Sequence, residues 1–173
     1  WITKSNNLKR KLKYTLQIIE VGKSKVGVNT HLTNKIVSHA LQNNTIKYFN
    51  HNLKIRNEQT FGKNTRFDFY LENLKNKIFL EVKNVTLKRE KKLAEFPDSV
   101  TSRGTKHLNE LISARKKGYK AYIMYVIQRE DCDKFNVAKD IDPEYSKAFK
   151  IAINEKVKVI CYDCKFSSKG IKL

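Results

Sequence analysis

Cysteine and proline are scarce in this chain of 173 residues, with three and two copies respectively, and no apolar run reaches the roughly 18 residues of a membrane-spanning helix. An odd, low count of cysteines is typical of a reducing compartment rather than of a disulfide framework. Structural zinc needs four ligands, and the single pair Cys161-x-x-Cys164 has no second pair to complete a site. We therefore predict small buried thiols and a cytoplasmic protein that does not associate with membranes.

Arginine is also scarce, with 7 copies against 29 lysines, whereas acidic residues number only 17. The resulting net charge of +19 and the sequence pI of about 9.8 favour a polyanionic partner, and nucleic acid is the first candidate. Codon usage in an A·T-rich genome explains part of the lysine excess, because asparagine is abundant too. Few arginines argue against a dense, sequence-specific interface. The predicted partner is DNA, single- or double-stranded, with RNA as a further possibility, and the oligomeric state is left open.

Hydrophobic periodicity predicts an alternation of strands and helices along the chain. Residues 12–28 resemble two strands around a turn, and the later elements are strands at 53–61, 66–71, 78–82, 121–128 and 157–162 and helices at 33–42, 105–117 and 143–155. Thr33 is the predicted N-cap of the first helix, Gly118 the stop of the second, and Pro143 the opening of the third. The order predicts an α/β fold (α+β with a mixed sheet).

Two consecutive predicted strands carry charged residues inside apolar sequence, RFDFYL and IFLEVKN. Alternation places Phe67, Phe69 and Leu71 on one face of the first strand, and Asp68 on the other. In the second strand, Glu81 and Lys83 share a face, so neighbouring strands would bring the three charges together. Two adjacent carboxylates repel each other and favour a divalent cation, and oxygen ligands select Mg²⁺ or Mn²⁺ over zinc.

The same three residues have an ordinary explanation, which is a salt bridge between Lys83 and either acid on a solvated sheet face. The spacing D-x12-E-x-K over two strands followed by a helix is more specific, because it is the layout of the PD-(D/E)xK nuclease superfamily. In that interpretation Asp68, Glu81 and Lys83 are catalytic. Asp68 and Glu81 ligate the metal, and Lys83 orients the attacking water while the metal stabilises charge on the phosphoryl oxygens.

Further polar residues lie near this pattern. Glu58, on the preceding strand, is a candidate third metal ligand or an ordinary exposed partner. Asn34 stands on the first helix, where many such nucleases carry an acid, and this leaves a second metal site open. Lysine and arginine suit phosphate contacts, and a helix start favours anions. The predicted nucleic-acid-binding residues are Arg66, Arg103, Lys106, His107 and Asn34.

The runs RFDFYL, FLEVKNVTL and AEFPDSVTSRGTKHLNEL, flanked by VNTHLTNKIVSHAL and IDPEYSKAF, closely resemble the sugar fermentation stimulation protein family over essentially the whole chain. The resemblance implies a restriction-endonuclease-like PD-(D/E)xK domain at 29–173, preceded at 1–28 by the C-terminal part of a truncated OB-fold β-barrel. It also implies DNA binding. We therefore predict a DNA-binding protein that is a Mg²⁺- or Mn²⁺-dependent nuclease. The alternative is a non-catalytic DNA-binding regulator of sugar metabolism genes that retains the nuclease fold.

Overall fold

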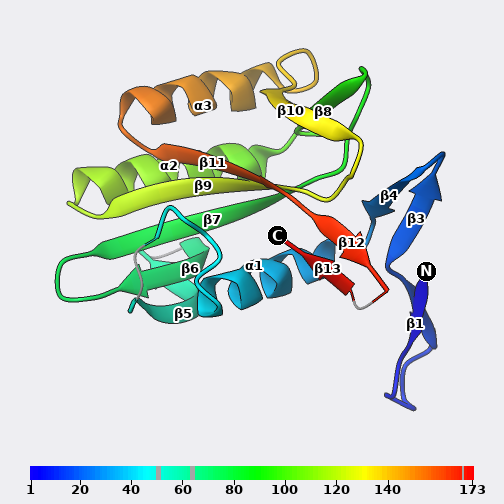
Figure 1. The fold of residues 1–173 in the computed structure, drawn as a ribbon. Helices are drawn as coiled ribbons and strands as arrows, with labels where there is room; N and C mark the ends of the chain where they lie inside the picture. The colour runs from blue at the N-terminus through cyan, green and yellow to red at the C-terminus, as the bar shows by residue number, and fades with distance from the viewer. Residues whose placement is uncertain (50–51, 63–64, 169) are drawn as a thin grey trace.

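A five-stranded mixed sheet forms the centre of the computed structural model, which describes residues 1–49, 52–62, 65–168 and 170–173 (Figure 1). The strand order is β11-β9-β7-β6-β5, comprising β11 (Lys158–Asp163), β9 (Lys120–Ile127), β7 (Lys77–Val85), β6 (Thr65–Glu72) and β5 (Lys54–Phe61). Strands β5, β6 and β7 form an antiparallel meander, whereas β7, β9 and β11 run parallel. The predicted mixed α/β architecture is confirmed.

Helices cover both faces of the sheet (Figure 1). One face carries α1 (Thr33–Gln42), and the other carries α2 (Ser102–Lys116) and α3 (Pro143–Asn154). The apolar face of α1 is buried, and its members are Ile36, Val37, Ala40 and Leu41. Because β7 and β9 are covered on both faces, two hydrophobic clusters form, one under α2 and α3 and one under α1.

Two of the three predicted helix starts differ from the structure. A 3₁₀ turn, η1 (Thr30–Leu32), precedes α1, so Thr33 lies inside the helix and its hydroxyl donates to the Thr30 carbonyl at 2.9 Å. The prediction of Thr33 as N-cap is therefore wrong. Helix α2 begins earlier than expected because the Thr101 hydroxyl accepts from the Gly104 N–H at 3.0 Å. Pro143 opens α3 as predicted.

The charged segment after β7 contains a strand that the sequence did not predict. Strand β8 (Lys92–Phe96) pairs in parallel with β10 (Cys132–Val137). The many charged residues of this segment made it resemble a solvated loop. In the structure these charges neutralise one another, because Arg89 donates to Glu95 at 2.7 Å and also pairs with Asp140.

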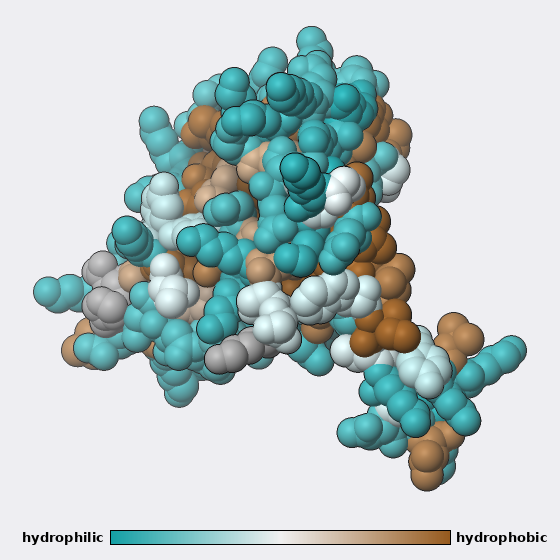
Figure 2. Space-filling model, turned by 45° about the vertical axis from the view of Figure 1, so that its right-hand side comes forward, coloured by the Kyte–Doolittle hydropathy of each residue, from teal (hydrophilic) through white to brown (hydrophobic). Residues whose placement is uncertain are grey.

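The N-terminal residues form two hairpins: β1 (Ile2–Lys4) with β2 (Tyr14–Leu16), and β3 (Ile18–Val21) with β4 (Ser24–Gly27). They project from the body with mixed apolar and polar surface (Figure 2). Strand β4 contacts the main domain through Gly27, whose N–H donates to the Gln128 carbonyl at 2.9 Å. The strands predicted within 12–28 are thus present, whereas the OB-fold assignment and a domain boundary at residue 28 stay predictions.

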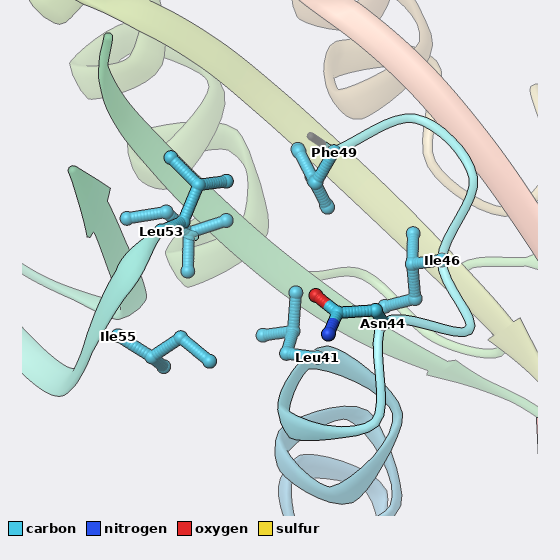
Figure 3. A pocket seen from close by; sticks show the side chains of 7 residues that line it. Leu41, Asn44, Ile46, Phe49, Leu53 and Ile55 are labelled. Carbon is cyan, nitrogen blue, oxygen red and sulfur yellow. The ribbon is translucent and has the colours of Figure 1, made fainter. Parts of the chain in front are cut away.

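An apolar pocket lies between the end of α1 and the start of β5 (Figure 3). Its lining residues are Leu41, Asn44, Ile46, Phe49, Leu53, Ile55 and Leu71. Near the C-terminus, β12 (Lys165–Ser167) pairs with β13 (Gly170–Lys172) on the α1 side. The cysteines are free; Cys164 is buried as predicted, but Cys161 is exposed. Among the described residues, no helix is long and apolar enough to cross a membrane.

Candidate active site

The sheet is irregular at Asp68, where the candidate site lies. The β5–β6 ladder pairs Asn57 with Phe69 and Gln59 with Phe67, and it skips both Glu58 and Asp68. Glu58 takes a left-handed backbone conformation with φ of 53°. Phe67 therefore packs under α2, while Phe69 packs under α1. The prediction that Phe67 shares a face with Phe69 and Leu71 is wrong, because this irregularity breaks the alternation.

Asp68 is held where β6 and β7 stop pairing. The pairing of β6 with β7 begins at Phe69 opposite Leu80, and the Asp68 Oδ2 atom accepts from the Val82 N–H at 2.8 Å. The Oδ1 atom accepts from Asn34 Nδ2 at 2.7 Å, so α1 also fixes the carboxylate. Burial and the nearby Glu81 carboxylate raise the pKa of Asp68. Asn34 thus positions this acid, and its predicted contact with nucleic acid stays a prediction.

Glu81 is only 2% exposed and faces α2. Its Oε1 atom accepts a hydrogen bond from Lys83 Nζ at 2.7 Å and also contacts His107 Nδ1. Its Oε2 atom is buried and has no hydrogen-bond partner within the described ranges. Burial alone would raise the pKa of Glu81, but the bonds from His107 and Lys83 outweigh it and lower that pKa. The carboxylate is therefore ionised at neutral pH.

The predicted convergence of three charged residues is confirmed in position, because Asp68, Glu81 and Lys83 line one open cleft between α1, β7 and the start of α2. Asn34, Glu58, Arg103 and His107 also line it. Arg66 lies 3.3 Å from Glu58 in an exposed ion pair, and Lys106 is exposed on α2. His107 is buried against Glu81, which makes it a partner of that carboxylate in this structure.

The donor set fits a divalent cation in part. Two carboxylates of like charge share the cleft, and the bare Oε2 of Glu81 is the kind of buried acceptor that an ion satisfies. Glu58 lines the cleft but pairs with Arg66, and no three Asp, Glu, His or Cys side chains converge as a metal site among the described residues. An ion held by Asp68 and Glu81 would need further oxygen atoms from water, the main chain or a substrate. The role of Glu58 as a ligand stays a prediction.

Sequence reasoning missed a polar group beside these acids. Asn84, directly after Lys83, and Thr33 line the same cleft, and the buried Gln128 side chain contacts both. A signal was present in the sequence, because Gln128 is a polar residue at the end of the apolar run AYIMYVIQ. Such a residue, when buried, must find hydrogen-bond partners.

Comparison with known proteins gives consistent matches. The model of the sugar fermentation stimulation protein RE domain matches residues 31–170. The sugar fermentation stimulation protein homolog of Pelagibacter ubique is 54% identical over 173 residues, covering 100% of this chain and 75% of that protein. The homolog of Bartonella quintana is 43% identical over 172 residues, covering 99% and 74%.

A solved structure has the same fold. It is that of Pyrococcus furiosus SfsA in complex with Ca²⁺, with a TM-score of 0.88 and 24% identity, covering 98% of this chain and 72% of that chain. The family resemblance noted in the sequence is thereby confirmed. With a family model that spans most of its length and a relative at 54% identity, the chain belongs to the sugar fermentation stimulation protein family.

Proposed function

We propose that the chain binds nucleic acid, DNA first, in the cleft around Asp68 and hydrolyses phosphodiester bonds with the help of a divalent cation. The observation that carries the proposal is the pair of carboxylates, Asp68 and Glu81, with Lys83 beside them. The Oε2 atom of Glu81 is buried and has no hydrogen-bond partner among the described residues. The net charge of +19 supports a polyanionic substrate. The Ca²⁺ in the Pyrococcus furiosus SfsA complex supports a divalent cation.

Asp68 and Glu81 would hold the cation, which is Mg²⁺ or Mn²⁺ in this proposal. When bound, the cation supplies charge stabilisation for the phosphoryl oxygens and lowers the pKa of water. Asn34 and the Val82 N–H keep the Asp68 carboxylate in place, and His107 fixes Glu81 from the opposite side of the cleft. These contacts orient both acids before a substrate arrives, which is the preorganisation that catalysis requires.

Lys83 would orient the attacking water and neutralise charge that develops on the phosphate. Its ammonium group has three donors, and the structure assigns one of them to Glu81 Oε1. Arg103 lines the cleft at the start of α2, where the N-terminal end of the helix dipole favours a phosphate. The substrate strand would therefore run between the start of α2 and the start of α1.

The test is metal-dependent cleavage of single- and double-stranded DNA and of RNA by the purified chain. We expect cleavage with Mn²⁺, none with EDTA, and a loss of at least 100-fold for Lys83→Ala, given typical contributions of a proton-transfer or water-orienting group. Lys91→Ala is the matched control, because Lys91 is exposed outside the cleft and its removal changes the net charge equally. Equal cleavage by the wild type and Lys83→Ala would contradict the assignment.

A non-catalytic DNA-binding regulator is the second candidate. The observation that favours it is the close contact of Lys83 with Glu81 at 2.7 Å, because an ammonium group paired with a carboxylate is also an ordinary structural salt bridge. This candidate predicts DNA retention without cleavage in any divalent cation. The cleavage assay separates the two candidates, and binding assays at matched salt, with RNA as competitor, give the nucleic-acid preference.

A further inference from the structure

A buried polar group lies deeper than the carboxylates, at the junction of α1, β7, β9 and β4. Gln128 is 0% exposed, and its Nε2 atom lies 2.5 Å from Asn84 Oδ1 and 3.0 Å from Thr33 Oγ1. Its backbone is fixed as well, because its N–H donates to the Val85 carbonyl at 3.0 Å. The side chain therefore joins the strand that carries Glu81 and Lys83 to the first residue of α1.

The hydrogen bonds around Thr33 give the orientation of the two carboxamides. The Thr33 hydroxyl donates to the Thr30 carbonyl at 2.9 Å and accepts from Gln128 Nε2 at 3.0 Å. The same NH₂ group of Gln128 donates to Asn84 Oδ1 at 2.5 Å, so the oxygen of Asn84 points into the interior. One NH₂ group has two donors, which matches these two acceptors.

The backbone of β4 holds this arrangement in place. A Cβ atom at Gly27 would lie only 2.4 Å from Gln128 Oε1, so the glycine backbone packs directly against the carboxamide. The Oε1 atom is buried and has no partner among the described residues. The Gln128 side chain consequently has little room to turn, and its NH₂ group stays directed at Asn84.

Asn84 is left with a donor for the cleft. Its oxygen is engaged in the interior, and no hydrogen bond from its Nδ2 atom is found in the part of the chain that the structure describes. The residue is half-buried, lines the cleft and directly follows Lys83. An NH₂ group has two donors and no acceptor, which suits a non-bridging phosphate oxygen.

We infer that Asn84 donates from Nδ2 to a phosphate oxygen of the bound nucleic-acid strand, and that the buried Gln128 is the positioning residue that keeps this donor facing the cleft. The inference rests on the nucleic-acid binding in the proposed function and names a further binding residue for it. Unlike Arg103 or Lys35, which also line the cleft, this donor is uncharged. Its contribution to affinity is therefore independent of counterion release.

Asparagine-to-aspartate substitution gives the sharpest test, measured as fluorescence anisotropy of short labelled oligonucleotides, single- and double-stranded, without divalent cation. Asn84→Asp keeps the oxygen that Gln128 contacts and replaces the donor with a negatively charged acceptor. We expect it to weaken binding well beyond tenfold, and Asn84→Ala to weaken it about tenfold with an unchanged salt slope. Asn136→Asp is the matched control, because Asn136 is exposed on β10, away from the cleft, and the change adds the same charge.

Oligonucleotides with a single methylphosphonate, scanned along the strand, identify the acceptor. The Asn84→Ala loss should disappear at one methylphosphonate position, because both changes remove the same hydrogen bond. Gln128→Met should weaken binding in the wild-type background but not in the Asn84→Ala background. If Gln128→Met does not fold, the Asn84 variants and the methylphosphonate scan still test whether Asn84 donates to a phosphate oxygen.

Three results would overturn the inference or its basis. Equal affinities for Asn84→Asp and Asn136→Asp would refute the donor. An Asn84→Ala loss that persists with every methylphosphonate would assign the contact to a base or sugar and refute a phosphate. A wild-type chain that binds no nucleic acid would overturn both the inference and the proposed function, whereas binding without Mn²⁺-dependent cleavage would overturn the hydrolysis alone.

Discussion

Replacing Asp68 with asparagine should stabilise the metal-free protein while abolishing its response to divalent cations. Burial and the Glu81 carboxylate raise the pKa of Asp68, so its charge costs folding free energy at neutral pH. The amide keeps both existing contacts: its oxygen accepts from the Val82 N–H, and its NH₂ group can donate to the Asn34 carboxamide after that group turns over.

The gain has a calculable size and pH dependence. Removing a carboxylate whose charge is disfavoured by burial and by Glu81 should relieve on the order of 1 kcal/mol, the usual scale of a single substitution. In a chain of 173 residues this raises Tm by about 2–4 °C. Because the folded-state pKa lies above the ordinary value of 3.8, the advantage of Asp68→Asn is full at neutral pH. It disappears as the pH falls through the raised pKa towards that value.

Thermal unfolding followed by circular dichroism, with EDTA and then with Mn²⁺ or Ca²⁺, tests both parts. The wild type should gain stability with the cation, since the ion binds the folded state, and Asp68→Asn should not. Asp131→Asn is the control with the opposite sign, because bonds from Arg129 and Lys88 hold the pKa of Asp131 well below its usual range. A lower Tm for Asp68→Asn than for the wild type in EDTA would refute the reasoning.

Two other substitutions test the surroundings of the site. Gly27→Ala should lower Tm by an amount corresponding to about 1–3 kcal/mol, because the added Cβ would lie 2.4 Å from Gln128 Oε1; an unchanged Tm would show that β4 is free to shift. Arg89 lowers the pKa of Glu95, so Arg89→Ala should destabilise the protein above pH about 4.5 and have little effect in acid. Urea unfolding at neutral and acidic pH measures this difference, and equal losses at both would contradict an ionic role.

The sequence predicted the sheet and the location of the site well, because both depend on simple periodicity. Alternation in IFLEVKN placed Glu81 and Lys83 on one face, and the structure confirms this. Apolar runs of strand length correctly indicated β9, which lies in the interior of the fold, and β11, which forms an edge of the sheet and buries only Ile160. The family motifs identified the same residues by an independent route.

Features that depend on three-dimensional pairing were not predictable in the same way. The irregularity at Asp68 arises from a left-handed Glu58 on the neighbouring strand, and no period-two pattern contains that information. Strand β8 was not predicted because its segment is rich in charged residues. Their partners are distant in sequence, as Arg89 and Asp140 are, which lie 51 positions apart. The hydrogen bond from Asn34 to Asp68 spans 34 positions of sequence, so no local pattern indicated it.

The separation of β6 from β7 at Asp68 has a consequence for protein engineering. The Asp68 carboxylate accepts a hydrogen bond from the Val82 N–H at the point where the strands stop pairing. The backbone of β7 therefore helps to hold the acid in position. Transplanting Asp68, Glu81 and Lys83 into a regular two-stranded ladder would place the first acid opposite a paired backbone group and leave it without this donor. A successful graft would have to include the divergence of the two strands, and library designs that randomise loops should leave these strand interiors fixed.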